Sequence, residues 1–427
     1  MSTTLMQQNS VPSVKLVDLR NQDDGVDYPD EGFPAWLTVF GAFLALFCSF
    51  GQLNAFGTYQ SWYATHQLQH LHPSAIAWIG SIQLCVFFVS GGFIGRIFDT
   101  HGPRIIMALG TVVYVSSIML TSLAGTYYQY IITQGILFGL GVGMLFYPPL
   151  AAISTHFSKY RATALGIAMV GSGIGGTVYP ILLQKLFIHI GFAWGVRVSG
   201  FICLALCAVA TGTVTSRLSP KRCPTQSPWL DVKTFKDTQF VLLVIGSCFI
   251  SLGLFIPFFY IVSYGLDIGV SPNTAFYVLA VLNAGSVLGR IAPALVADAF
   301  GRFTLLVPCA FMAGLSSLVI WTFARSLPSL MLYAALYGLF SGAFNALIVP
   351  CIAQVSDIRE IGVRIGILYS VISFPSLLSG PTAGALLTLA HGSYTGLIVL
   401  NGATVIIGSL FLLWSKLKIN PSIFARV

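Results

Sequence analysis

Charged side chains are scarce in this chain of 427 residues. Asp, Glu, Lys and Arg together make up 8% of it, whereas about a quarter of the residues of a soluble protein are charged. Hydrophobic residues make up 56%, and about 20 consecutive apolar residues are enough to cross the hydrocarbon of a bilayer. The composition excludes an ordinary soluble domain and predicts an all-α polytopic membrane protein. Twelve apolar stretches are expected as membrane spans, at about 36–59, 74–98, 105–124, 129–152, 162–186, 192–214, 238–264, 271–297, 304–324, 328–353, 364–388 and 393–415.

Several chemical signatures are also missing. No glycine is followed by a lysine, which excludes the P-loop of an ATP-driven pump. No group of residues has the spacing of metal ligands or of a nucleophile triad, and the eight cysteines are scattered, so we interpret the cysteines as small packing residues. We therefore expect no enzyme, no cofactor, no metal and no use of ATP. No Asp or Glu lies in the middle of a predicted span, where a proton relay normally needs one.

A polar segment, residues 95–104, interrupts the most hydrophobic part of the chain between the second and third predicted spans. It lies at one face of the membrane because it joins two spans. The segment recurs, since Asp298 follows Asp99 and Gly301 follows Gly102 at the same offset of 199 residues. Repetition at one offset predicts two related halves, which is typical of secondary transporters. The same offset links Pro73 with Pro272, Gly139 with Gly338 and Gly143 with Gly342.

The positive charges indicate how the chain is oriented. If residues 95–104 face the cytoplasm, all of the 21 Lys and Arg residues except Lys185, Arg197 and Arg325 lie on or near that side. This asymmetry follows the positive-inside rule, and it places both termini in the cytoplasm. The net charge of +8 is thus explained by topology, and no nucleic-acid partner is expected.

Two six-helix halves are expected, joined by a polar segment that carries five basic residues. The N-terminal segment is polar and contains an acidic run, so it is predicted to be disordered. The predicted parts are a cytoplasmic N-terminal tail (1–35), an N-terminal half (36–214), a cytoplasmic linker (215–237), a C-terminal half (238–415) and a cytoplasmic C-terminal tail (416–427).

Six plus six spans, with a polar hinge after spans 2 and 8, resemble the major facilitator superfamily. The hinge motif of that superfamily reads Gly-x-x-x-Asp-x-x-Gly-x-Arg, and Gly95, Asp99, Gly102 and Arg104 match it. The resemblance covers nearly the whole chain. It implies a carrier of twelve transmembrane helices in which two pseudo-symmetric halves rock about a central site.

The second copy of the hinge departs from the motif in two places. Asp298 and Gly301 are kept, but Ala294 replaces the first glycine and Arg302 comes one position early. In both copies the carboxylate can face an arginine or the positive end of a neighbouring helix. A contact made in one conformation and lost in the other would bias the equilibrium between them; the alternative is simple capping of the loop. The residues predicted to take part in gating are Gly95, Asp99, Gly102, Arg104, Asp298, Gly301 and Arg302.

Four segments resemble the monocarboxylate-porter family, especially its fungal members: 30–36, 78–83, 171–176 and 191–197. Family members carry an arginine in span 8 that is thought to meet the carboxylate of the substrate. Arg290 lies inside that span, where an arginine costs about 2.5–3.5 kcal/mol on insertion scales, so it is expected to face a cavity. The alternative is a structural arginine paired with backbone carbonyls or an acid at the end of a span.

Two positions depart from the proton-coupled members of that family. Those carriers have a lysine in span 1 and an aspartate four residues before the span-8 arginine, and this chain has Asn54 and Ser286 there. We therefore hypothesise that the carrier does not couple to protons through the usual lysine–aspartate pair. It would work as a facilitator, as an exchanger, or as a proton symporter that uses other groups.

Polar and aromatic residues that interrupt apolar runs are candidates for the wall of a substrate cavity. For any one of them, helix packing or contact with lipid is the alternative. As a group they favour a large, partly planar organic solute over a small one such as lactate. The predicted substrate-binding residues are Arg290, Asn54, Gln83, Tyr147, Phe259, Tyr260, Asn283, Ser286 and Asn345.

The function expected from these features is secondary active or facilitative transport of a small organic solute, a carboxylate or a vitamin-like molecule, by alternating access. Export of a fungal specialised metabolite is the first alternative, and a nutrient receptor of the same fold that does not transport is the second. The lipid bilayer and the solute are the expected partners, and the protein is expected to be a monomer. The plasma membrane is the expected location, with the vacuolar membrane as the alternative.

Overall fold

The computed structural model describes residues 32–71, 73–217, 237–357 and 360–422. Every regular element in these ranges is a helix. Twelve helical spans in the described part are long and apolar enough to cross a bilayer. This confirms the fold class and the twelve spans predicted from the sequence.

The N-terminal half contains six spans. The first is broken into two helices near Asn54, and the fourth begins with a short helix and a π-helical stretch at Ile131–Leu137. The helices are α2 (Phe33–Leu53), α3 (Phe56–Thr65), α4 (Pro73–His101), α5 (Pro103–Thr121), α6 (Tyr127–Tyr130), α7 (Phe138–His156), α8 (Arg161–Ile190) and α9 (Phe192–Thr213).

The C-terminal half repeats this arrangement. Its first span is also broken, at Phe255, just before a proline at position 257 that has no N–H for the helix ladder. The helices are α10 (Thr238–Leu254), α11 (Ile256–Asp267), α12 (Pro272–Phe300), α13 (Arg302–Val319), α14 (Leu327–Gln354), α15 (Ile361–Leu389) and α16 (Thr395–Ile419), with a 3-10 turn at Trp321–Phe323 after α13.

The polar hinge is shorter than the segment predicted from the sequence. Only Gly102 separates α4 from α5, and only Gly301 separates α12 from α13. Both glycines have positive φ angles, 75° and 102°, a conformation that glycine adopts at little cost. The charged residues of the hinge therefore belong to the ends of long helices, because a helix can continue past the apolar core of the membrane.

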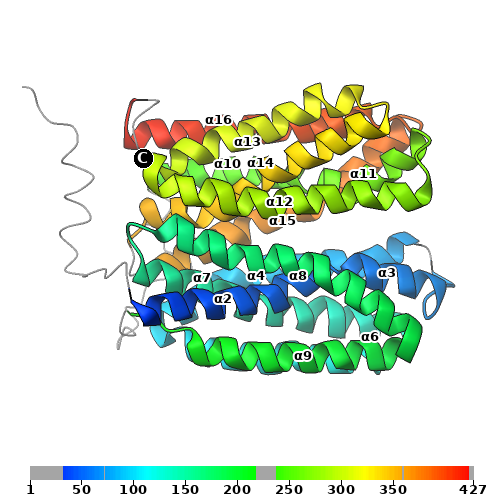
Figure 1. Cartoon of the computed structure of the whole chain (residues 1–427), viewed down its shortest axis with the longest axis horizontal. Helices are drawn as coiled ribbons and strands as arrows, with labels where there is room; N and C mark the ends of the chain where they lie inside the picture. The colour runs from blue at the N-terminus through cyan, green and yellow to red at the C-terminus, as the bar shows by residue number, and fades with distance from the viewer. Residues whose placement is uncertain (1–31, 72, 218–236, 358–359, 423–427) are drawn as a thin grey trace, which may run out of the picture.

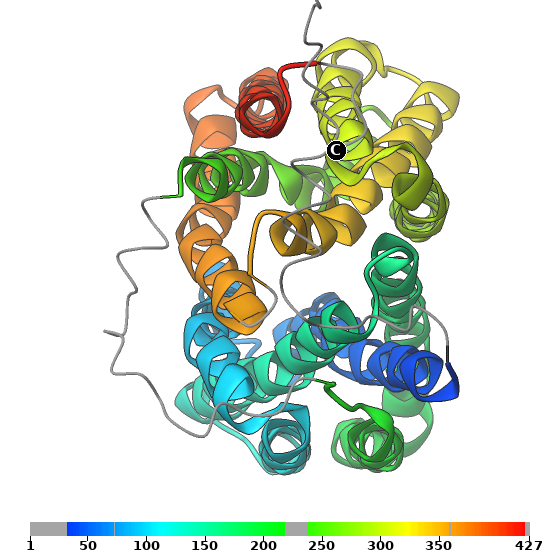
Figure 2. The same cartoon turned by 90° about the vertical axis from the view of Figure 1, so that its left-hand side faces the viewer.

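The two halves form separate bundles that lie side by side (Figure 1). Within the N-terminal half α2 packs on α8, and α7 packs on α4 and α5; within the C-terminal half α12 packs on α14, and α16 packs on α10 and α13. The largest contacts between the halves are those of α4 with α15 and of α8 with α12 (Figure 2), and α8 also touches α14 and α7 touches α15. We call the end of the molecule where both hinge glycines lie the hinge end.

The duplicated glycines have equivalent packing roles. A side chain at Gly139 of α7 would collide with the backbone of α4 at Gln83, and one at Gly338 of α14 would collide with the backbone of α12 at Leu282. Gln83 and Leu282 are themselves 199 residues apart. The internal repeat therefore preserves a close approach of two helix backbones, which is a common way for membrane helices to associate.

The predicted boundaries of the halves and tails remain predictions. Residues 1–31 of the predicted tail and 218–236 of the predicted linker lie outside the described residues, as do residues 423–427. Where the chain is described, α2 begins at Phe33 and α16 continues to Ile419. These ends lie three and four residues beyond the spans predicted from the sequence.

Candidate functional site

A narrow cavity lies between the two halves. Its volume is about 30 Å³, which is about the volume that one molecule occupies in liquid water. Helices α2, α4, α7 and α8 line it from one half, and α10, α12, α14 and α15 line it from the other. The lining residues are Phe50, Phe88, Phe146, Met169, Ser251, Leu254, Phe255, Arg290, Phe344, Asn345, Ile348, Leu368, Tyr369 and Ile372.

The two walls of this cavity have different chemistry. The N-terminal half contributes three phenylalanine rings and the thioether of Met169, and these are apolar. All of the polar side chains in the lining come from the C-terminal half, and they are Ser251, Arg290, Asn345 and Tyr369. A ligand between the walls would meet only apolar side chains on the N-terminal side, and four hydrogen-bonding side chains among apolar ones on the C-terminal side.

Arg290 is the charged residue of this lining, and only 6% of it is exposed. Its Nη1 donates hydrogen bonds to Ser172 Oγ (2.7 Å) and to the carbonyl of Met169 (3.3 Å), both in α8 of the other half. Its Nε has no hydrogen-bond partner among the described residues. A buried donor without a partner is costly, so this edge of the guanidinium is suited to an anionic ligand.

At the hinge end, Asp99 joins α4 to the other half. Its carboxylate accepts hydrogen bonds from the backbone N–H groups of Gly362 (3.1 Å) and Val363 (2.9 Å). These are the second and third residues of α15, and the first N–H groups of a helix have no partner within it and form its positive end. Asp99 therefore caps a helix of the opposite half.

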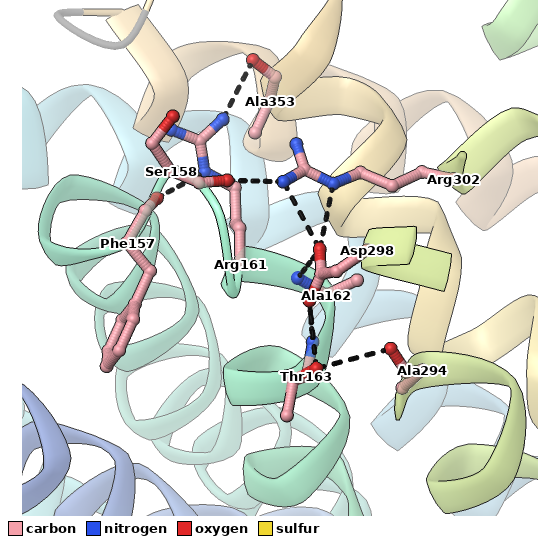
Figure 3. A network of polar contacts seen from close by, with 9 residues as sticks. All are labelled: Phe157, Ser158, Arg161, Ala162, Thr163, Ala294, Asp298, Arg302 and Ala353. Carbon is pink, nitrogen blue, oxygen red and sulfur yellow. Dashed lines mark hydrogen bonds and ion pairs between the residues drawn. The ribbon is translucent and has the colours of Figure 1, made fainter. Parts of the chain in front are cut away.

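Asp298 makes the equivalent contact in the opposite direction (Figure 3). It accepts hydrogen bonds from the N–H groups of Ala162 (3.0 Å) and Thr163 (2.8 Å), the second and third residues of α8. The hydroxyl of Thr163 adds a third bond of 2.9 Å. Arg302 forms an ion pair with Asp298 at 3.3 Å.

Two arginines also bridge the halves at this end (Figure 3). Arg302 Nη2 donates to the carbonyl of Ser158 at 2.5 Å, and Arg161 Nη1 donates to the carbonyl of Ala353 at 3.4 Å. An arginine from each half thus binds a backbone carbonyl in the other half, in the last turn of α14 (Ala353) or two residues after the end of α7 (Ser158). We call this arrangement, in which the two halves are joined at the hinge end, hinge-closed.

Among the remaining gating candidates, Gly95 lies at the contact between α4 and α15. A side chain at Gly95 would collide with the backbone of Gly362, so the glycine lets α4 and α15 touch. At the other contact, Ala294 faces Gly166, which has no side chain to oppose the methyl group. Arg104 is exposed at the start of α5, and no bond links it to the rest of the described chain. A role of these residues in gating stays a prediction.

The sequence model of the family described as the Major Facilitator Superfamily matches residues 42–318 of this chain, which is more than half of it. The chain belongs to the major facilitator superfamily. It is therefore a membrane transporter, as the sequence analysis expected, and its fold and family are those of carriers.

Fungal members of the superfamily are similar over nearly the full length. The chain is 37% identical to the MFS-type transporter 1 of Ophiocordyceps sp., over 95% of this chain and 91% of that protein. It is 37% identical to the aspyridones efflux protein of Emericella nidulans (91% and 79%). It is 36% identical to the fujikurins efflux protein of Gibberella fujikuroi (91% and 84%).

Solved structures of the superfamily share the fold at low identity. The fucose:proton symporter FucP of E. coli matches with a TM-score of 0.71 and 13% identity, over 90% of this chain and 98% of that one. The human organic anion transporter MFSD10 matches with a TM-score of 0.69 and 16% identity, over 89% and 98%. At these identities the likeness shows the fold of a facilitator carrier and nothing more.

Of the nine residues predicted to bind the substrate of this facilitator carrier, Arg290 and Asn345 line the cavity. Tyr147 lies beside it, because its ring is 5.4 Å from that of Tyr369, and its hydroxyl donates to the carbonyl of Phe87. Gln83 Oε1 and Ser286 Oγ are buried atoms without a hydrogen-bond partner among the described residues.

The other four candidates lie elsewhere in the carrier. Asn54 is exposed at the break between α2 and α3. Asn283 donates to a carbonyl of its own helix at 3.1 Å, and Tyr260 donates to the carbonyl of Gly380 at 3.1 Å. Phe259 is 52% exposed. In the hinge-closed arrangement none of these four is part of the described lining of the cavity.

Sequence reasoning missed several residues of this cavity. Tyr369 interrupts an apolar run in the predicted span 364–388, so the rule that selected Tyr147 could have found it. Phe50, Phe88 and Met169 stand within apolar runs, and nothing in the sequence distinguishes them from residues that face lipid. A contact between two halves is needed to identify them.

Proposed function

We propose that this transporter exports an acidic, amphipathic organic metabolite with a flat apolar body. The observation that carries the proposal is the lining of the central cavity, in which most side chains are apolar and all of the polar ones, with Arg290 as the charged group, lie on the C-terminal wall. The printed names of fungal relatives, the aspyridones and fujikurins efflux proteins, support the direction of transport. Uptake of an organic carboxylate is the second candidate, and it is favoured by the resemblance to monocarboxylate porters.

In the proposed mechanism, the anionic group of the substrate binds the guanidinium of Arg290. Its apolar body packs on the phenylalanine rings of the N-terminal half. The bidentate fork of arginine suits a carboxylate or another planar oxyanion. A cavity of about 30 Å³ is too small for such a molecule, so the substrate is bound while the two halves are further apart than in the hinge-closed arrangement.

Alternating access completes the mechanism. The capping contacts of Asp99 and Asp298 form when the hinge end closes, and they break when it opens to the cytoplasm. The excess of Lys and Arg near this end supports a cytoplasmic location for it and for both termini. We further propose a monomer in the plasma membrane that uses no ATP and that lacks the lysine–aspartate pair of proton-coupled porters, because Asn54 and Ser286 stand at those positions.

Transport assays with a matched pair of probes test the substrate class and the direction. The probes are 2-naphthoate, a flat aromatic carboxylate, and 2-naphthamide, which has the same shape without the charge. In a yeast strain that expresses the carrier, we expect faster loss of preloaded 2-naphthoate and no change for the amide. Arg290→Ala should abolish the effect, and Arg290→Lys should retain part of it because charge remains while the fork is lost.

Two further measurements separate the alternatives. Accumulation of 2-naphthoate from the medium, instead of its loss, would replace export by uptake. A proton uncoupler should leave the initial rate of downhill flux unchanged in reconstituted vesicles, and abolished flux would contradict the proposal that the usual coupling is absent. Equal transport of the acid and the amide, unaffected by Arg290→Ala, would overturn the role of Arg290.

A further inference from the structure

Arg290 is held by the half of the molecule to which it does not belong. It is a residue of α12, but the described bonds of its Nη1 go to Ser172 Oγ and the Met169 carbonyl in α8. The hydroxyl of Ser172 donates to the carbonyl of Met169 at 2.7 Å, so its lone pairs face the guanidinium. The three groups form a closed triangle in which each polar atom has a partner.

The helix α8 provides the space for this contact. Position 173 is a glycine, and a Cβ atom there would lie 3.0 Å from Arg290 Nη1 and 2.7 Å from the side chain of Val287. Ser172 is fully buried, so water does not compete for its oxygen in this arrangement. The sequence Ser172-Gly173 therefore offers one acceptor and one gap at the point where the guanidinium crosses between the halves.

The contact depends on the conformation of the carrier. Ser172 and Arg290 lie on α8 and α12, the two helices that Asp298 joins at the hinge end. When these helices separate, Arg290 loses both acceptors on its Nη1. Nη1 and Nε of the guanidinium then face the opened cavity without a protein partner, and the anionic group of a solute can form charge-assisted hydrogen bonds with them.

We propose that Ser172 and the anionic group of the substrate take turns as partners of Arg290. Hinge closure brings the hydroxyl of Ser172 to the guanidinium, where it takes the place of the anion, so closure lowers the affinity for the substrate and releases it. Hinge opening separates Ser172 from the guanidinium and raises the affinity for an anion again. The release step rests on the proposed function, whereas the bond between Ser172 and Arg290 across the halves does not.

A double-mutant cycle tests the cross-half bond without any ligand. Spin labels at positions 97 and 296, two exposed sites near the hinge end of α4 and α12, would report the distance between the halves. The full-length carrier would be studied in lipid nanodiscs, with its native cysteines replaced. Because a hydrogen bond to a charged group is worth about a tenfold change in equilibrium or more, Ser172→Ala should lower the ratio of closed to open molecules roughly tenfold.

The cycle predicts that Arg290→Ala lowers the same ratio and that the double variant is no more open than Arg290→Ala alone. Ser172→Thr keeps the hydroxyl and should remain near wild type. Ser154→Ala is the matched control, because it removes a buried hydroxyl of α7 that bonds only to its own helix among the described contacts, at 3.1 Å. Additive effects of the two substitutions, or a ratio unchanged by Ser172→Ala, would overturn the proposed bond.

A second arm tests the exchange of partners. Adding 2-naphthoate should shift the wild type toward the open distribution, and 2-naphthamide should not. In Ser172→Ala, flux of 2-naphthoate should show a lower KM and a lower kcat, because the anion is retained for longer. A higher KM at unchanged kcat would mean that Ser172 positions Arg290 for the substrate and does not replace the substrate. If the two substitutions are coupled in the double-mutant cycle but 2-naphthoate does not change the distance distribution, the proposed substrate class is contradicted and the bond between Ser172 and Arg290 is still supported.

Discussion

The two contacts that join the halves at the hinge end have the same plan and different chemistry. At each contact an aspartate at the end of one helix caps the second and third residues of a helix in the other half. The contact between α4 and α15 relies on glycines that let two backbones touch. The contact between α12 and α8 relies on a hydroxyl and an ion pair. The internal repeat has conserved the cap and changed what surrounds it.

The departures from the hinge motif make sense when the two contacts are compared. Ala294 replaces the first glycine of the motif, and its methyl group faces Gly166. At the first contact Gly95 faces Gly362, so both partners are glycines. A methyl group gained on one helix is thus matched by its absence on the other, and the distance between the helices is maintained.

The shifted arginine has a similar explanation. Arg302 is the first residue of α13 and follows the turn at Gly301, which ends α12, and it forms an ion pair with Asp298 of α12. Arg104 follows Asp99 by five residues and is exposed. The arginine directly after the hinge glycine thus pairs with its aspartate, and the arginine one position later in the first copy is exposed.

The largest expected effect follows from removing Asp298. Asp298→Ala leaves Arg302 and the start of α8 without a nearly buried carboxylate, since the Asp298 side chain is only 7% exposed. Breaking such a pair costs about 3–5 kcal/mol, and the label pair at positions 97 and 296 should show a mostly open hinge end. Asp99→Ala removes the cap of α15 and should also open the hinge end, at a cost of about 1.5–3 kcal/mol. A closed fraction that neither variant lowers would contradict the role of the caps in closing the hinge end.

A smaller effect is expected from adding one methyl group at the glycine contact. In Gly95→Ala the new Cβ would collide with the backbone of Gly362, which cannot rotate away. Overpacking of this kind costs about 1–3 kcal/mol, and the same label pair should report a more open hinge end. Ala294→Gly is the matched control at the other contact, where losing a methyl group should change the distance little. An unchanged closed fraction in Gly95→Ala would show that α4 and α15 can accommodate a methyl group, and it would contradict the close packing proposed for this contact.

Much of this fold could be predicted from the sequence, because each membrane span is a long run of apolar residues. The repeat at one offset also identified Asp99 and Asp298 as equivalent. The partners of these carboxylates could not be found in the same way, since Gly362 and Ala162 are ordinary small residues at the starts of distant helices. Their role comes from unpaired N–H groups, which are a property of position in a helix.

The cavity shows the same limit. Arg290 was identifiable because a charge inside a membrane span is costly and must face a cavity or a partner. Its partner Ser172 is one of many serines in apolar runs. Phe50, Phe88 and Met169 became part of a wall only through contact between the halves. Sequence reasoning therefore finds residues whose burial inside a membrane span costs free energy, and it misses residues whose role depends on a neighbour that is distant in the sequence.

The smallest expected effect comes from giving the contact of α4 with α15 the hydroxyl group that the contact of α12 with α8 has. Val363 stands where Thr163 stands in α8, each is the third residue of its helix, and each N–H binds the Oδ2 atom of its aspartate. Val363→Thr keeps the branched shape and adds a hydroxyl that can reach Asp99, as the hydroxyl of Thr163 reaches Asp298 at 2.9 Å. A gain of about 0.5–1.5 kcal/mol for the hinge-closed arrangement is expected, seen as a larger closed fraction with labels at 97 and 296. Thr163→Val should lose a similar amount, and if neither substitution moves the distribution, the hydroxyl is not what distinguishes the two contacts.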